Sequence, residues 1–151
     1  MQMKFLCDHH KQWVMEQPDE ALNYIKGLED ELQYASMMQD ERKQSAIFGS
    51  GIETITLLLR QHKLDIIFLS TRLTNLSIRF ANFLEQREKY GLASKLISSS
   101  IATLLLLKDS NQQNGILNNQ LNSYGSRLKI KHAALVKNPI RSDDCNNKRS
   151  V

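Results

Sequence analysis

A scarcity of helix-ending residues constrains this chain more than any other feature. Only two prolines, Pro18 and Pro139, and six glycines occur among its 151 residues. Proline lacks the backbone N–H, and glycine inside a helix costs about 0.5–1 kcal/mol relative to alanine. The rest of the chain is dominated by long segments of Leu, Ile, Glu, Lys and Gln without the alternation typical of strands. We therefore expect an all-α protein.

Apolar residues spaced three or four positions apart divide the chain into about six helical segments. Their approximate limits are 3–16, 19–37, 41–61, 65–84, 90–108 and 117–135. Two readings of the third segment stay open, because Gly49 and Gly51 indicate either a close approach of two helices or a break. Short connections between the helices predict stacked antiparallel hairpins, in a right-handed solenoid or a helical bundle.

The length predicts one domain, because 151 residues can bury a single substantial core. The contents of apolar residues, 41 %, and of charged residues, 24 %, are those of ordinary globular proteins, which excludes collagenous and disulfide-framework classes. We expect this domain to span residues 1–136. The polar, basic segment 137–151 is expected to be a disordered tail.

Charge is distributed unevenly along the chain. Residues 1–44 carry five Lys/Arg and nine Asp/Glu, a net charge of −4, whereas residues 112–151 carry seven and two, a net charge of +5. This gradient has two interpretations. It can steer an acidic partner toward the C-terminal part, or the two ends can attract each other within one molecule.

Cysteine content and hydropathy favour a cytoplasmic protein. Cys7 and Cys145 lie far apart in the sequence and form no disulfide framework. The first ten residues become polar before a signal-peptide core is reached. The most apolar run, residues 104–107, is much shorter than the roughly 20 residues of a membrane span. Neither export nor membrane association is expected.

Internal similarity favours a repeat architecture. A shift of 47 residues aligns Ala46 with Ala93, Thr56 with Thr103, and residues 57–59 with residues 104–106. Large and small residues also recur around a hinge at Lys89-Tyr90-Gly91, and this set comprises Phe80, Ala81, Leu84, Tyr90, Ala93, Ile97 and Ser100. The segment resembles one tetratricopeptide repeat, about 34 residues of the 151. The resemblance implies a helical hairpin that binds proteins or peptides in a groove.

A ladder of polar residues along the fourth segment is the predicted partner-binding surface. Its members recur at steps of three and four residues, away from the Leu/Phe stripe: Arg72, Asn75, Arg79, Asn82 and Gln86. Asparagine can hydrogen-bond a peptide backbone, and arginine can hold a carboxylate through two hydrogen bonds. The alternative is a helix face that only contacts water.

Basic residues near the C-terminus give a second candidate site. Arg127, Lys129 and Lys131 are the predicted phosphate contacts, and His132, Lys137 and Arg141 extend the set. Tyr124 is the only aromatic residue nearby, although single-stranded nucleic acids usually bind where basic and stacking groups combine. A nucleic-acid-associated regulator is therefore the alternative function.

Catalytic and metal-binding motifs find little support in the sequence. Cys7, His9 and His10 place a thiol beside two imidazoles, but a closed zinc site needs four ligands and no second pair follows. No phosphate loop and no dinucleotide-binding motif occurs. We expect no enzyme, cofactor, metal or catalytic residue. A small enzyme remains a third possibility, which predicts a deep pocket with titratable groups.

These observations favour a non-enzymatic interaction module that acts as an adaptor, chaperone or regulatory subunit. The partner is expected to be a protein or peptide, and nucleic acid is the less favoured alternative. Homo-oligomerisation through the Leu-rich fifth segment stays open, because a short solenoid leaves an apolar end that another surface must cover.

Overall fold

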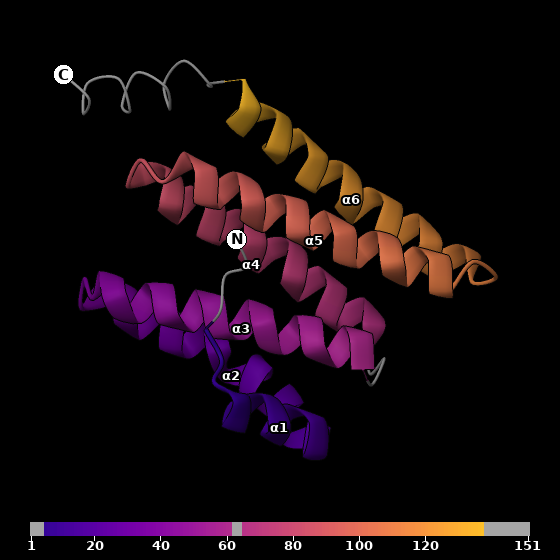
Figure 1. The fold of residues 1–151 in the computed structure, drawn as a ribbon, viewed down its shortest axis with the longest axis horizontal. Helices are drawn as coiled ribbons and strands as arrows, with labels where there is room; N and C mark the ends of the chain where they lie inside the picture. The colour runs from indigo at the N-terminus through magenta and orange to yellow at the C-terminus, as the bar shows by residue number, and fades with distance from the viewer. Residues whose placement is uncertain (1–4, 62–64, 138–151) are drawn as a thin grey trace. The chain divides into compact units, whose positions relative to one another are not determined.

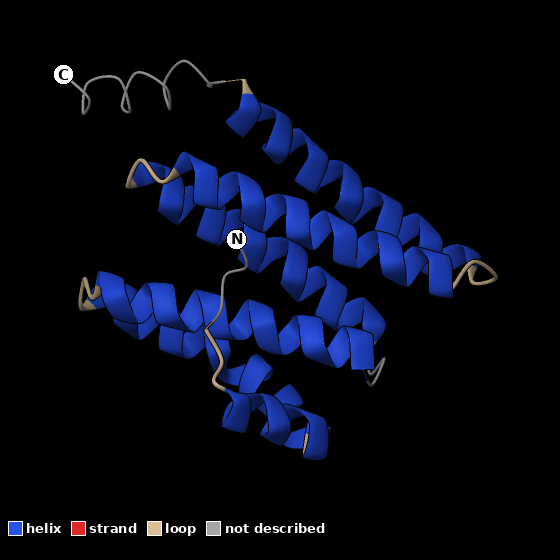
Figure 2. Cartoon of the chain, viewed as in Figure 1, coloured by secondary structure: helices blue, strands red, loops and turns tan. Residues whose placement is uncertain are grey.

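Six α-helices make up nearly all of the residues that the computed structural model describes, 5–61 and 65–137. They are labelled in Figure 1. In chain order they are α1 (Asp8–Glu16), α2 (Pro18–Met37), α3 (Glu41–Gln61), α4 (Ile66–Gln86), α5 (Tyr90–Ser110) and α6 (Gly115–Val136). Within the described ranges there is no strand, as Figure 2 shows. The predictions of an all-α fold and of about six helices are confirmed.

The chain divides into two compact units, and the division falls inside α4. The first unit, Met1–Leu76, holds α1, α2, α3 and the first half of α4. The second unit, Ser77–Val151, holds the second half of α4 together with α5 and α6. Of the predicted tail 137–151, only Lys137 lies within the described residues.

In the first unit, α2 and α3 form an antiparallel hairpin that α1 contacts on both helices. Pro18 opens α2 in the first turn, where its missing N–H costs no hydrogen bond. Gln39 adopts a positive φ of 53° in the connection. Asp40 then accepts a hydrogen bond from the backbone N–H of Lys43 at 3.0 Å, which caps the start of α3.

Two glycines of α3 mark close approaches, and the helix runs through both without a break. A Cβ at Gly51 would lie 2.6 Å from Cδ2 of Leu28 on α2. A Cβ at Gly49 would overlap the ring of Phe5. A close approach of two helices is therefore confirmed at Gly51, whereas Gly49 is approached by Phe5, which lies outside the helices, and the alternative of a break in α3 is wrong.

Residues 5–7, just before α1, are not helical, and Phe5 and Leu6 are anchored to α3, so that α1 begins at Asp8 and not near residue 3. The carboxylate of Glu53 accepts hydrogen bonds from the backbone N–H groups of Phe5, at 2.9 Å, and Leu6, at 2.5 Å. Leu6 is buried. These contacts span more than 45 residues of sequence, and helical periodicity carries no information about them.

In the second unit, α5 and α6 pack together along their length. The hydroxyls of Ser77 on α4 and Ser100 on α5 are buried and lie 2.7 Å apart. Glu88, with a φ of 59°, lies in the turn between α4 and α5, and Tyr90 already belongs to α5. The predicted hinge is therefore displaced toward the N-terminus. Asn114 caps α6 by accepting a hydrogen bond from the N–H of Leu117 at 3.1 Å.

One helix in the described residues, α5, is long and apolar enough to cross a membrane, with a mean hydropathy of 1.4 in its most apolar window. Of that window, 39 % is buried within the structure. A core helix of a water-soluble protein meets the same two criteria. Length and composition therefore do not by themselves assign α5 to a membrane.

Candidate functional site

The predicted polar ladder lies on one side of α4, opposite the buried Leu73 and Phe80. Its members differ in exposure. Arg79, Asn82 and Gln86, which belong to the second unit, are exposed. The two remaining members, Arg72 and Asn75, belong to the first unit and are half-buried. The C-terminal half of α4 therefore presents the more accessible part of the ladder.

Arg72 already has a carboxylate partner within the first unit. Its guanidinium forms an ion pair with Glu29 of α2 at 3.2 Å, and the two side chains are 24 % and 41 % exposed. It also lies over the ring of Phe68, 5.2 Å from the ring centre. Arg72 thus links α2 and α4, a role that the sequence analysis did not assign. Contact between Arg72 and an external partner remains a prediction.

The end of α4 is connected to α6 by a short ion pair. The ammonium of Lys131 lies 2.7 Å from the carboxylate of Glu85, and both side chains are less than one-third exposed. Beside this pair, the guanidinium of Arg87 stacks on Phe83 at 3.5 Å from the ring centre. It also donates a hydrogen bond to the Phe83 carbonyl at 2.8 Å. These contacts fix the helix end that carries Asn82 and Gln86.

The predicted phosphate contacts do not share one face of α6. Arg127 and Lys131 are four residues apart, whereas Lys129 is about 200° from Arg127 around the helix at about 100° per residue. Lys131 is paired with Glu85, and His132 lies 3.3 Å from the hydroxyl of Ser94. Arg127, Lys129 and Lys137 are exposed, and Arg141 lies outside the described residues. Phosphate binding by these residues remains a prediction.

The Cys7, His9 and His10 group lies at the start of α1, on the surface. The Cys7 sulfur is 3.4 Å from Nδ1 of His10. The rings of His9 and His10 are tilted with their centres 6.2 Å apart. Within residues 5–61 and 65–137, no three His, Cys, Asp or Glu side chains come together as metal ligands would.

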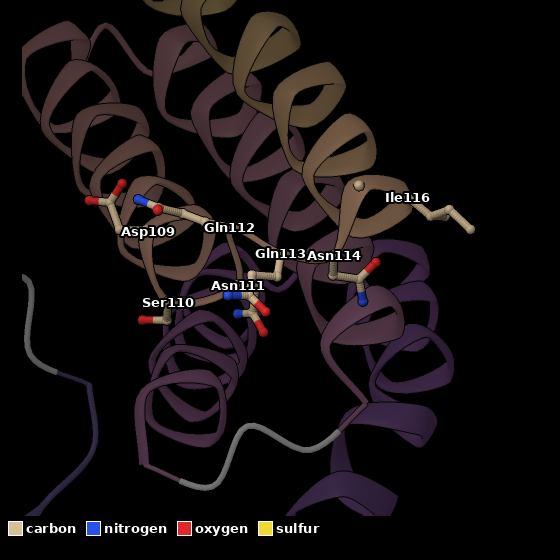
Figure 3. A pocket seen from close by; sticks show the side chains of 8 residues that line it. Asp109, Ser110, Asn111, Gln112, Gln113, Asn114 and Ile116 are labelled. Carbon is tan, nitrogen blue, oxygen red and sulfur yellow. The ribbon is translucent and has the colours of Figure 1, made fainter.

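A hollow at the turn between α5 and α6 was not expected from the sequence. Its volume is about 800 Å³, and its lining runs from Asp109 to Ile116 (Figure 3). Asp109 is the only titratable side chain in the lining, and the other polar side chains there are amides and one hydroxyl. Asn118 steadies the turn by donating a hydrogen bond to the Gln112 carbonyl at 2.9 Å. Such groups can exchange hydrogen bonds, but they provide no paired acid and base.

Among the residues that the structure describes, Tyr24 of the first unit is the titratable group with a shifted pKa. Burial raises the pKa of the Tyr24 hydroxyl, and a hydrogen bond with Ser50 at 3.0 Å acts in the opposite direction. This contact joins α2 to α3. Tyr24 therefore belongs to the packing of the hairpin.

Comparisons with the models of known protein families, with curated proteins and with solved structures gave no match for this chain.

Proposed function

We propose that the chain is a non-enzymatic interaction module that holds an extended acidic segment of a partner protein against the C-terminal half of α4. The observation that carries the proposal is the row formed by Arg79, Asn82 and Gln86, which are exposed at steps of three and four residues. The amides of Asn82 and Gln86 would pair with the partner's backbone. Arg79 would bind a carboxylate of the partner.

Net charge supports an acidic partner. Residues 77–137 carry nine Lys/Arg and three Asp/Glu, a net charge of +6. A field of this sign raises the encounter rate with an acidic chain and rejects a basic one. The proposal thus joins short-range hydrogen bonding on α4 to long-range attraction by the second unit.

The rigid support of the row also favours this function. The ion pair between Lys131 and Glu85 and the stacking of Arg87 on Phe83 restrain the end of α4. A preorganised surface loses less conformational entropy when a peptide binds. The resemblance of this segment to a tetratricopeptide repeat points to the same use, as an adaptor, chaperone or regulatory subunit in the cytoplasm.

Peptide binding tests the proposal. Fluorescently labelled 15-residue peptides of acidic, neutral and basic composition would be titrated with the full-length protein, and binding followed by anisotropy. We expect acidic peptides to bind best. The variant Asn82→Ala/Gln86→Ala should weaken that binding about tenfold, which corresponds to about 1.4 kcal/mol, because two pairs of hydrogen-bonding groups are lost.

A matched control is available on α6. Asn119 and Asn122, three residues apart, are exposed amides as well, so Asn119→Ala/Asn122→Ala removes similar groups without changing the net charge. This variant should bind like the wild type. Equal losses in both variants would contradict the proposal, and so would equal binding of acidic and basic peptides. Tighter binding of an oligonucleotide that Asn82→Ala/Gln86→Ala leaves unchanged would favour the nucleic-acid alternative.

A further inference from the structure

The outer face of α5 has the composition of a buried surface but is open to solvent. Apolar and small residues occur on all sides of this helix, a pattern typical of helices covered all round. Yet Leu105 and Leu106 are 48 % and 52 % exposed, and Ala102 is exposed beside them. The buried residues of α5 lie on its other side and include Ile97, Leu104 and Leu107.

The exposed residues of this face have a heptad-like spacing. We name as the α5 outer face the seven residues Lys95, Ser98, Ser99, Ala102, Leu105, Leu106 and Asp109, all of which are exposed. At about 100° per residue they fall within about 60° on either side of Ala102. Successive members are three, one, three, three, one and three residues apart, so the pattern repeats every seven residues. A seven-residue repeat keeps the stripe on one side of the helix, as in coiled-coil pairs.

The charges along the α5 outer face are placed so that two copies of the face, lying antiparallel, complement each other. Lys95 and Asp109 lie seven residues before and after Ala102, about 10 Å along the helix in each direction. When a second α5 lies antiparallel across Ala102, each Lys95 therefore comes level with Asp109 of the second copy. No salt bridge of either residue occurs among those of the described residues.

Side-chain size matches in the same register. The small Ala102 of each copy would lie at the crossing, where two helix backbones must come closest. Leu105 and Leu106 of each copy would then lie opposite Ser98 and Ser99 of the other, so that large residues face small ones along the pair. The same surface is used by both copies, as in a two-fold symmetric dimer.

We infer that the α5 outer face binds a second copy of this chain in an antiparallel, two-fold symmetric pair of α5 helices centred on Ala102. The contact is one helix face long, at the small end of specific interfaces, so the dimer is weak and concentration-dependent. It is separate from the row on α4 and does not depend on peptide binding there.

Charge reversal tests both that the partner is a second copy of the chain and that the two α5 helices are aligned about Ala102. Sedimentation equilibrium of the full-length protein over a range of concentrations should show a monomer–dimer equilibrium. Lys95→Glu places two carboxylates opposite each other at both ends of the pair, and Asp109→Lys places two ammonium groups there. Each variant should weaken dimerisation about tenfold or more, and the double variant Lys95→Glu/Asp109→Lys should restore it, because opposite charges again face each other.

Controls separate this face from other apolar surfaces and from a lipid-binding role. Leu105→Glu should abolish the dimer, whereas Ile130→Glu, at a 72 % exposed position on α6, should leave it intact. Circular dichroism would show that each variant is folded. A strictly monomeric wild type, a dimer insensitive to Leu105→Glu, or a failure of the double charge reversal to restore dimerisation would overturn the inference. The inference would also be overturned if the protein sedimented together with phosphatidylcholine vesicles and did not self-associate.

Discussion

Replacing Phe80 by alanine is expected to lower the free energy of unfolding by about 3–5 kcal/mol. Phe80 is 1 % exposed and is among the largest fully buried side chains of the described residues. Its ring lies 6.1 Å from that of Phe83, so the substitution removes both apolar burial and an aromatic contact. Because a domain of this size is stable by only about 5–15 kcal/mol, the loss is a large share of the total.

Urea unfolding followed by circular dichroism measures this effect. Tyr34→Ala serves as the control, because Tyr34 is an aromatic residue on α2 that is 59 % exposed. Its substitution should change the free energy of unfolding by no more than about 0.5 kcal/mol. A similar loss in the two variants would show that Phe80 does not lie in a tightly packed core.

Leu28→Ala is expected to cost about 2–5 kcal/mol, since Leu28 is fully buried where α2 meets α3. A second substitution makes the prediction more specific. In the Leu28→Ala protein, Gly51→Ala should recover about 0.5–1 kcal/mol, because alanine is the better helix former and its methyl group enters the vacated space. In the wild type the same change should bring no gain, because the new Cβ would lie 2.6 Å from Cδ2 of Leu28.

The four proteins of this double-mutant cycle would be compared by denaturant unfolding under identical conditions. The expected signature is a favourable coupling between the two substitutions. Gly27→Ala provides the control for helix propensity, because nothing lies within 4 Å of a Cβ at that exposed position of α2. If Gly51→Ala stabilised the wild type as much as Gly27→Ala does, the close approach of α2 and α3 at Gly51 would be refuted.

Helix positions followed from local sequence because helical periodicity and end signals act over a few residues. Pro18 and Asp40 mark the starts of α2 and α3, and the predicted limits of α3 match the structure. The predicted start of α1 was wrong because the carboxylate of Glu53 binds the backbone N–H groups of Phe5 and Leu6, which do not join the helix. The turns at Gln39 and Glu88 use positive φ without glycine, so composition gave no signal for them.

The candidate site was less predictable because its contacts join residues distant in sequence. Spacing alone identified the ladder on α4, but it could not show that Glu29, 43 residues before Arg72, already pairs with that arginine. In the same way, spacing could not show that Glu85, 46 residues before Lys131, pairs with that lysine. Periodicity finds which side of a helix faces water, whereas the pairing of surface charges depends on how the helices pack.

Mapping the peptide-binding surface of the protein by NMR tests the central claim most directly. In a titration of the ¹⁵N-labelled full-length protein with an acidic 15-residue peptide, two-dimensional NMR spectra would follow every backbone and side-chain amide. The proposed function predicts that the signals of Arg79, Asn82 and Gln86 shift first and most, while those of Asn119 and Asn122 stay in place. Shifts centred on the turn at residues 109–116 or on α6, or no shift with any acidic peptide, would contradict it.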